Sequence, residues 1–289
     1  MKKKKLLLLG ATGMAGHVAY YYLNSTDKYE IINVVFRERL TDDSIILNIT
    51  DKFATERLVR EIQPDIVLNC IGVLIKGSQL YPDNAIYINA YVPHLLERLC
   101  AEVHLKLIHI STDCVFSGKK GNYAESDVRD ADDVYGKSKG LGEIINNKDL
   151  TIRTSIIGPE LKEQGEGLFH WFMQQKGEIN GYTKAYWSGV TTLELAKAID
   201  IAIDQNISGL VHLTNGEKIT KYELLCLFKN IWKKDGIIVK PYIGKIVDKS
   251  LIKSERFRYN VPSYEEMLHA QLEFMTSHDC LYDKYFRYD

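Results

Sequence analysis

Leu6-Leu-Leu-Leu-Gly10-Ala-Thr-Gly13-Met-Ala-Gly16 is a short apolar run that leads directly into three glycines, each three residues after the last. Such a run is typical of a central parallel strand that is covered on both faces. A glycine-rich turn between a strand and a helix brings backbone N–H groups and the positive end of the helix dipole to a pair of phosphates. The stretch therefore predicts the first βα unit of a dinucleotide-binding fold, although its spacing differs by one residue from Gly-x-Gly-x-x-Gly.

Apolar runs and amphipathic segments continue to alternate after this turn. We expect strands at 31–36, 45–47, 66–68, 107–110 and 150–153, and helices at 13–24, 52–62, 83–103 and 135–147. Strands that alternate with helices in this way predict a doubly wound parallel sheet with right-handed crossovers. The expected fold class is therefore α/β, of the Rossmann type.

The alternation loosens beyond about Gly158, where further helices are expected at 191–205, 220–232 and 263–275. We therefore expect a dinucleotide-binding Rossmann domain at residues 1–158 and a smaller α/β substrate-binding lobe at residues 159–289. The lobe should interleave with the first domain, because the alternation does not break cleanly. The aromatic-rich tail from Cys280 to Asp289 is expected to cap the core, with a dimer contact as the alternative.

Composition excludes several classes of function. The 37 basic and 38 acidic residues leave a net charge of −1, without the basic surface that nucleic acid requires. No apolar run approaches the roughly 18 residues of a membrane span, and Gly10 ends the first run too early for a signal peptide. Five widely spaced cysteines without a Cys-x-x-Cys pair argue against a disulfide framework and against a metal site. We expect a cytoplasmic protein with no nucleic-acid or membrane partner.

Tyr135-Gly-Lys-Ser-Lys139 suggests where the chemistry lies. A tyrosine and a lysine four residues apart lie on one face of a helix. A nearby ammonium favours the phenolate form, so it should lower the pKa of Tyr135 and allow proton transfer near neutral pH. The alternative is an ordinary pair on a solvated helix. Together with the glycine turn, the pair indicates an enzyme that transfers a hydride.

Several further motifs follow the glycine turn in order. They are Asn48-Ile-Thr-Asp51, Pro64-Asp-Ile-Val-Leu-Asn-Cys-Ile-Gly72, Asn89, Ser111-Thr-Asp-Cys-Val-Phe-Ser-Gly118, Tyr135-Gly-Lys-Ser-Lys139, Gly142-Glu143 and Arg153-Thr-Ser-Ile-Ile-Gly158. In this order they resemble the extended short-chain dehydrogenase/reductase family, and most closely its dTDP-4-dehydrorhamnose reductase-like branch, which acts on nucleotide-linked 4-keto sugars. The resemblance covers most of the chain.

The resemblance implies a role for each matching position. Thr112 would hydrogen-bond the substrate carbonyl oxygen, Tyr135 would donate a proton to it, and Lys139 would hold the nicotinamide ribose and tune Tyr135. The resemblance also implies the cofactor-binding residues, which are Gly10, Thr12, Gly13 and Met14 at the turn, Asn48 and Ile49 by the adenine, and Cys70, Ile71 and Gly72 along the cleft.

Arg37 and Glu38 follow the second expected strand, where the adenosine ribose binds. A carboxylate at this point binds the ribose 2′-hydroxyl of NADH, whereas an arginine binds the 2′-phosphate of NADPH. Because Arg37 comes first, we expect NADPH rather than NADH.

Comparison with the family also bears on the reaction. Related dehydratases have Asp-Glu after the threonine, whereas Asp113 is followed here by Cys114, so elimination of water is not expected. The segment from Tyr186 to Thr192 lacks the Asp-Gln pair and the proline that are usual in rhamnose-pathway reductases. We therefore favour a UDP-4-keto-6-deoxy-N-acetylhexosamine, reduced at C4 for cell-surface polysaccharide synthesis. Trp187 and Arg256 are candidate substrate contacts, on the base or sugar and on the diphosphate.

Three alternatives remain open from the sequence. The first is a dTDP-4-dehydrorhamnose reductase, and the second is an NAD-dependent nucleotide-sugar epimerase that uses the same three residues. The third is a regulator that senses a dinucleotide without turnover, since a fold does not fix a function. A homodimer is possible in each case.

Overall fold

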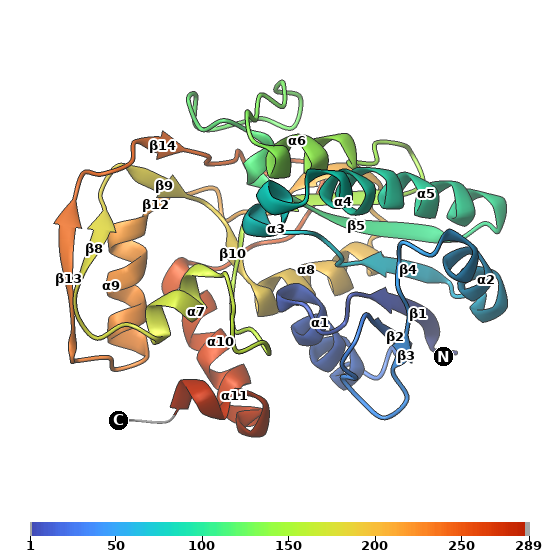
Figure 1. The fold of residues 1–289 in the computed structure, drawn as a ribbon, viewed down its shortest axis with the longest axis horizontal. Coiled ribbons are helices and arrows are strands. Elements are labelled where there is room, and N and C mark those ends of the chain that lie inside the picture. The colour runs from blue at the N-terminus through green and yellow to red at the C-terminus, as the bar shows by residue number, and fades with distance from the viewer. Residues whose placement is uncertain (1, 287–289) are drawn as a thin grey trace.

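The structure, a computed structural model, describes residues 2–286 and is built around a seven-stranded sheet (Figure 1). From one edge to the other the strands are β11 (Gly209–His212), β6 (Leu150–Thr154), β5 (Lys106–Thr112), β4 (Ile66–Asn69), β1 (Lys4–Leu9), β2 (Tyr29–Val35) and β3 (Ile45–Ile46). All neighbouring pairs run parallel. The expected doubly wound α/β fold is confirmed.

Helices cover both faces of this sheet. The helices on one face are α1 (Met14–Ser25) and α8 (Thr192–Asp204), and those on the other are α2 (Lys52–Ile62) and α5 (Val92–Glu102). Leu6 and Leu8 of β1 pack in the first of these two cores, whereas Leu7 and Leu9 pack in the second. Successive side chains of a strand point to opposite faces, so a strand with both faces covered must be apolar throughout.

Part of the main sheet comes from the second half of the chain. Strand β11 pairs with β6, and α8 packs against α1. The boundary at residue 158 stays a prediction, but the sheet and its covering helices draw on residues from both sides of it.

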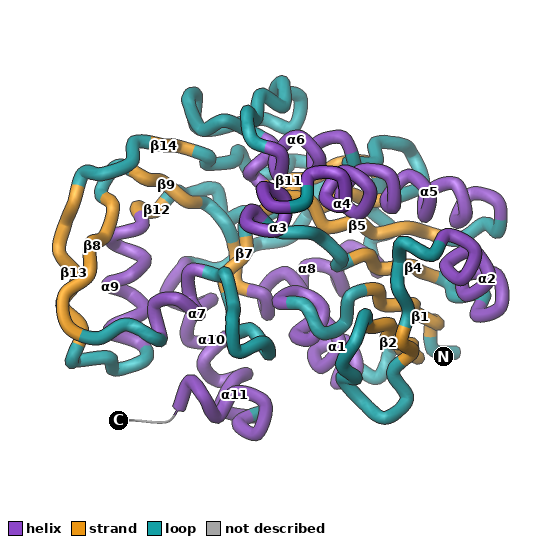
Figure 2. Tube along the Cα trace, in the orientation of Figure 1, coloured by secondary structure: helices purple, strands orange, loops and turns teal. Residues whose placement is uncertain are grey.

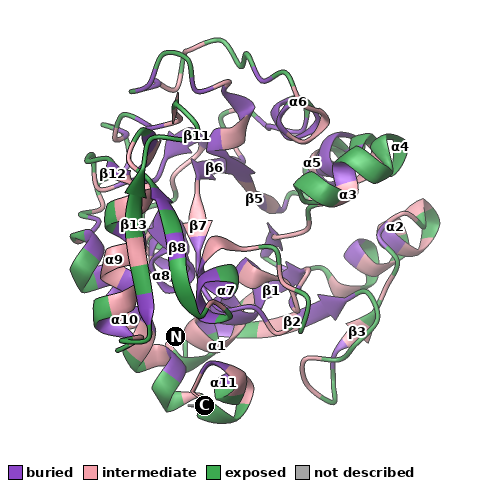
Figure 3. Cartoon of the chain, turned by 60° about the vertical axis from the view of Figure 1, so that its left-hand side comes forward, coloured by how far each residue is buried: buried purple, intermediate pink, exposed green. Residues whose placement is uncertain are grey.

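A smaller lobe lies beside the carboxyl ends of the main strands (Figure 1). Its elements are β8 (Gly177–Tyr182) paired with β13 (Ile237–Tyr242), the sheet of β12 (Ile219–Thr220), β9 (Ala185–Trp187) and β14 (Val247–Asp248), and the helices α7 (Leu168–Met173) and α9 (Lys221–Ile231). Most residues of the outer strand β13 are exposed (Figure 3). The short pair of β7 (Ile156–Ile157) and β10 (Val190–Thr191) runs between sheet and lobe (Figure 2).

The region between β4 and β6 departs in part from the expected elements. The helix expected at 83–103 is α4 (Pro82–Ile86), a π-helical turn at Tyr87–Tyr91 and α5, preceded by α3 (Ile75–Leu80). The helix expected at 135–147 is wrong beyond Leu141, because α6 spans only Val134–Leu141. After α6 the backbone of Ile144 bonds to the Thr151 hydroxyl, through N–H at 3.1 Å and C=O at 2.7 Å, so it no longer pairs along the helix.

The chain ends in α10 (Tyr264–Ser277) and α11 (Asp279–Phe286). Tyr282 and Tyr285 of α11 are buried in the core that α1 also forms. The part of the tail at residues 280–286 therefore caps the core, whereas residues 287–289 lie outside the described residues. None of the helices within residues 2–286 is long and apolar enough to cross a membrane.

Candidate active site

The glycine turn forms a cradle at the carboxyl end of β1. Gly10 has φ +81°, and a Cβ added there would lie 2.9 Å from Ile71 Cγ1. A Cβ at Gly16 would lie 2.1 Å from the Gly10 carbonyl oxygen, so α1 can approach β1 only with glycine at this position. Gly13 is the N-cap of α1 and offers no side chain to the first N–H groups of the helix. These features suit a phosphate pair at the helix N-terminus.

Most of the other predicted cofactor residues lie at the same edge of the sheet. Thr12 and Met14 belong to the turn and to the first turn of α1, and Asn48 and buried Ile49 follow β3. Cys70 follows β4, bonded through its N–H to Leu9, and Ile71 packs on Gly10. Carboxyl ends of parallel strands meet at one edge, which is where open α/β sheets bind ligands.

Arg37 stands at the end of β2 with its side chain exposed, and its guanidinium carbon lies 4.8 Å from the centre of the Phe36 ring. The position is open to solvent at the same edge as the glycine turn. An anion at this edge can therefore reach the guanidinium from solvent.

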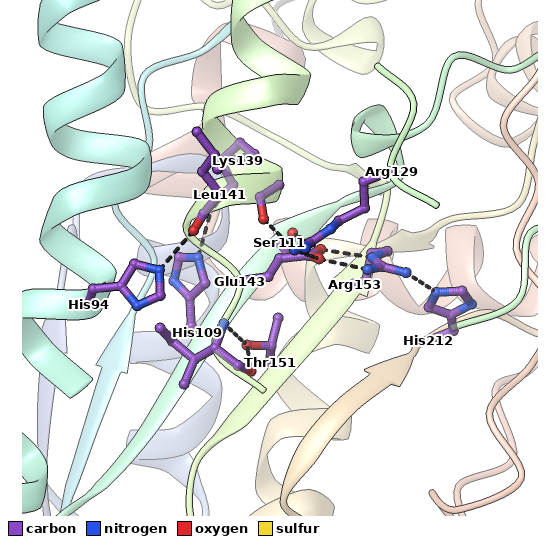
Figure 4. Close-up of polar contacts among 12 residues, drawn as sticks. His94, His109, Ser111, Arg129, Lys139, Leu141, Glu143, Thr151, Arg153 and His212 are labelled. Carbon is purple, nitrogen blue, oxygen red and sulfur yellow. Dashed lines mark hydrogen bonds and ion pairs between the residues drawn. The ribbon is translucent and has the colours of Figure 1, made fainter. Parts of the chain in front are cut away.

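Lys139 is buried, and its ammonium donates to the Ile110 carbonyl at 2.7 Å and lies 3.5 Å from His109 Nε2 (Figure 4). Asn69 contacts the other ring nitrogen of His109 at 3.1 Å. Burial lowers the pKa of Lys139 to about 8, although Glu143 and Cys70 oppose the shift. Burial and the charge on Lys139 hold the pKa of His109 well below its ordinary value, so this histidine is neutral. A Cβ at Gly72 would lie 4.0 Å from the Lys139 ammonium, so glycine leaves the space beside that ammonium free of a side chain.

Tyr135 and Thr112 come together from α6 and the end of β5. Asp133 caps α6 by accepting the Gly136 N–H at 2.8 Å, and the Tyr135 side chain lies beside Thr112. Burial raises the pKa of Tyr135, and Cys114 and Asp113 add to the increase. The predicted lowering of this pKa is therefore wrong, because burial disfavours the phenolate and the Lys139 ammonium bonds to the Ile110 carbonyl. A tyrosine that keeps its proton at neutral pH can still act as a proton donor.

Asp113 and Cys114 continue the site from Thr112. The Thr112 hydroxyl accepts the Cys114 N–H at 3.1 Å and donates to Asp113 Oδ1 at 3.2 Å. Burial raises the pKa of the Asp113 carboxyl, and the charges of Lys249 and Lys221 oppose this. Burial raises the pKa of the Cys114 thiol to about 12, which makes it a poor nucleophile.

Lys221 and Lys249 were not predicted from the sequence. Both are half-buried and bring positive charge from the lobe toward Asp113. Burial lowers the pKa of Lys221 to about 8. Lys221 occupies the first turn of α9 after the Thr220 cap, where the helix dipole disfavours a cation. The sequence feature that could have pointed to Lys221 is its position directly after a capping-box threonine, where a lysine is unfavourable.

The two predicted substrate residues have different surroundings. Trp187 is buried in β9, but the Lys221 ammonium lies 5.4 Å from the centre of its ring, so it borders the same group of side chains. Arg256 donates to the Ser208 carbonyl at 2.6 Å, directly before β11. In the sheet register the next residue, Gly209, is level with Ile108, which lies four residues before Thr112. The structure therefore does not bring Arg256 to the site.

Glu143 connects the elements that carry the three central residues (Figure 4). Its carboxylate accepts from Ser111 at 2.7 Å and from both Nε and Nη2 of Arg153, at 2.8 and 2.6 Å. Arg153 also contacts His212 of β11 at 2.8 Å. Ser111 directly precedes Thr112 in β5, and Glu143 follows the helix α6 that carries Tyr135. The bonds of Glu143 to Ser111 and Arg153 therefore fix the position of Tyr135 relative to Thr112. No group of three or more His, Cys, Asp or Glu side chains within residues 2–286 could hold a metal ion.

Comparison with known proteins places the chain in a family. Residues 4–250 match the family described as RmlD substrate binding domain. Methionine adenosyltransferase 2 subunit beta from Bos taurus is 23% identical over 269 residues, covering 88% of this chain and 79% of the relative. dTDP-4-dehydrorhamnose reductase from Aggregatibacter actinomycetemcomitans is 29% identical over 157 residues, covering 52% of this chain and 51% of that protein. The spore coat polysaccharide biosynthesis protein SpsK from Bacillus subtilis is 28% identical, covering 76% of each.

Among solved structures, dTDP-4-dehydrorhamnose reductase from Bacillus anthracis, in complex with NADP, superposes with a TM-score of 0.79. The two chains are 24% identical, and the match covers 94% of this chain and 100% of the other, so they share a fold. The match to residues 4–250 spans most of the chain, which therefore belongs to the RmlD substrate binding domain family, as its resemblance to the dTDP-4-dehydrorhamnose reductase-like branch predicted.

Proposed function

We propose that this protein reduces the C4 ketone of a nucleotide-linked 4-keto-6-deoxy sugar with NADPH, in the synthesis of a cell-surface polysaccharide. The observation that carries the proposal is that Tyr135 lies beside Thr112 at the edge of the sheet that also holds the glycine turn. The family supports a nucleotide-sugar reductase, as does the relative named dTDP-4-dehydrorhamnose reductase.

In this reaction the side chains manage the charge that develops on the carbonyl oxygen. Bound NADPH supplies the hydride. The Thr112 hydroxyl turns its one proton from Asp113 to the carbonyl oxygen, and Tyr135 gives its proton to that oxygen as the negative charge grows. A positioned general acid of this kind contributes about 10²–10⁴-fold in rate. Lys139, beside Gly72, holds the ribose hydroxyls and adds a positive charge close to the developing alkoxide.

For the substrate we favour a UDP-4-keto-6-deoxy-N-acetylhexosamine, because the segment from Tyr186 to Thr192 departs from the rhamnose-pathway sequence. A dTDP-linked substrate fits about as well. Lys221 and Lys249 replace Arg256 as the cations for the diphosphate, since they approach Asp113 beside the proton donor. Trp187 offers an aromatic face next to Lys221 for the base or the sugar.

The experiment that tests the proposal measures loss of NADPH absorbance with two substrates in parallel, UDP-4-keto-6-deoxy-N-acetylglucosamine and dTDP-4-keto-6-deoxy-mannose. Turnover of the UDP sugar supports the favoured substrate, and turnover of the dTDP sugar alone moves the assignment to a dTDP-4-dehydrorhamnose reductase. No turnover of either sugar, with NADPH bound, contradicts the proposed reductase for both substrates.

Two other functions would then be compared. An NAD-dependent epimerase would retain its nucleotide through purification, whereas a reductase exchanges its cofactor in every cycle. A regulator without turnover is favoured by one observation, the similarity to a protein named as a subunit of methionine adenosyltransferase. It is opposed by the presence of Thr112, Tyr135 and Lys139 in the cleft. A homodimer stays a prediction, which the molecular mass in solution tests.

Arg37→Ala tests the choice of cofactor. The guanidinium is the exposed cation at the end of β2, so its loss should weaken NADPH binding by about tenfold or more and leave NADH binding almost unchanged. Titration of both dinucleotides into the wild type and the variant measures this. Equal losses for the two would remove Arg37 from the 2′-phosphate site.

A further inference from the structure

The loop at residues 158–167, between β7 and α7, reaches the glycine turn (Figure 1). A Cβ at Gly167 would lie 2.6 Å from Met14 Cε, at the start of α1. The carboxylate of Glu160 accepts the Gly167 N–H at 2.6 Å, which closes the loop on itself. Residues 162–164 and 166 are exposed, whereas residues 158–160 are buried and Leu161 packs against the core. The part of the loop beyond Leu161 therefore has little apolar burial of its own to hold it in place.

The C-terminal helix α11 holds this loop from the outside. The Tyr285 hydroxyl accepts the Glu160 N–H at 3.0 Å, lies 3.2 Å from the Glu160 carbonyl oxygen and contacts His170 Nδ1 at 2.6 Å. The Lys284 ammonium donates to the carbonyls of Leu161 and Lys162, at 3.1 and 2.7 Å. Both side chains of α11 therefore bond to loop backbone, and both lie beyond residue 250, where the family match ends.

We propose that α11 clamps the loop at residues 158–167 against the glycine turn, and that Tyr285 is thereby a positioning residue for the dinucleotide phosphates. The proposal rests on the proposed function only in that the ligand of the turn is NADPH. A loop ordered in advance leaves less conformational entropy to be lost when the dinucleotide binds. Without the clamp the loop samples open positions, and the apparent affinity equals the affinity of the closed state multiplied by the fraction of time that the loop is closed.

The same helix provides a matched control. Tyr282 is buried one turn before Tyr285, with its ring centre 5.7 Å from that of His17 of α1. Within the described part of the chain, the Tyr282 hydroxyl has no hydrogen-bond partner. Tyr282→Phe therefore removes a buried hydroxyl that holds nothing, whereas Tyr285→Phe removes one that holds the loop. The two substitutions change the chemistry in the same way.

The experiment compares the wild type, Tyr285→Phe and Tyr282→Phe in the full chain, with three measurements. These are NADPH affinity by fluorescence titration, turnover at saturating NADPH, and amide hydrogen exchange within residues 158–167. We expect Tyr285→Phe to weaken NADPH binding roughly tenfold, as loss of hydrogen bonds to the loop would do, and to speed exchange in the loop. Turnover at saturation should stay within about twofold, because the clamp acts on binding and not on proton transfer. Tyr282→Phe should match the wild type in all three.

Equal NADPH affinities for the two variants would overturn the clamp, as would a loss of affinity in Tyr285→Phe without faster exchange in the loop. If Tyr285→Phe does not fold, Lys284→Met removes the other two bonds to the loop and is held to the same two criteria. If the wild type itself binds no NADPH, the proposed function fails. The comparison of exchange rates between the two variants then still decides whether α11 orders the loop.

Discussion

At the scale of single residues, the account depends on Tyr135 as the proton donor. Tyr135→Phe removes the hydroxyl and leaves the glycine turn and Lys139 in place. Turnover should therefore fall by at least about a hundredfold while NADPH affinity stays nearly intact. Steady-state kinetics together with a binding titration measure both quantities. Near-normal turnover in the variant would take the acid role away from Tyr135.

Lys139 should set the upper pH limit of activity. Burial lowers its pKa to about 8, and the ammonium loses its charge as the pH rises through that value. The pKa of Tyr135 is raised instead, so the tyrosine still carries its proton in this range. We expect kcat/KM to fall above about pH 8, and a profile that stays flat to about two pH units higher would contradict this.

The same shift affects stability in a direction that can be checked. The pKa of Lys139 is lower in the folded chain, at about 8, than the ordinary value of 10.5, so between these values the unfolded chain binds more protons. The contribution of Lys139 to the free energy of unfolding therefore rises as the pH increases from about 8 to 10.5.

Residues in compact motifs could be predicted from the sequence, whereas those that depend on the path of the chain could not. Gly10, Tyr135 and Lys139 stand in local patterns with a physical reason for each spacing. Arg256 was expected at the site but lies at the opposite edge of the sheet, and Lys221 was missed although it approaches Asp113. Nothing in the sequence between residues 213 and 260 reveals which end of the sheet each segment meets.

At the scale of elements, the buried ion pair of Glu143 and Arg153 fixes α6 relative to β5 and β6. Glu143→Gln leaves the Arg153 charge buried without its partner, which should lower the free energy of unfolding by about 3–5 kcal/mol. Arg129 also contacts Glu143, at 3.2 Å, but its side chain is 40% exposed. Arg129→Ala should therefore cost less than about 1 kcal/mol.

Denaturant unfolding of the two variants checks this difference. If Glu143→Gln and Arg129→Ala lower the free energy of unfolding by similar amounts, the Glu143 carboxylate is held by the exposed Arg129 as much as by Arg153. The double variant with Arg153→Met supplies a further control, because replacing both charges with neutral groups should recover part of the loss.

Elements with a strong local pattern were predicted well. A strand covered on both faces must be apolar throughout, and an amphipathic helix must repeat its apolar residues every three to four positions. The helix expected at 135–147 failed because Glu143 is held by Arg153 and the backbone of Ile144 bonds to Thr151. Both partners come from β6, after the helix in sequence. A tertiary contact of this kind overrides local helix propensity and leaves no trace in the local sequence.

At the scale of the whole molecule, we expect the chain to unfold as one unit. The central sheet contains β11, and α8 packs on α1, so residues on both sides of 158 complete one core. Calorimetry should show a single transition with equal calorimetric and van't Hoff enthalpies. Two transitions, or a stably folded fragment of residues 1–158, would instead support two separable domains.

The sequence predicted the doubly wound sheet because its βαβ units are local. The pairing of β11 with β6 joins segments about 60 residues apart and has no such local signature.

Transfer of deuterium from the cofactor to the sugar distinguishes the proposed reduction of a keto sugar from the alternative functions. NADPH that carries deuterium at the transferred position is incubated with the protein and the UDP and dTDP 4-keto sugars, and the sugar product is analysed by mass spectrometry. The account predicts a reduced sugar with one deuterium on the new carbinol carbon, and a much slower yield with Tyr135→Phe. An isomerised sugar without deuterium, or an unchanged keto sugar beside bound NADPH, would contradict it.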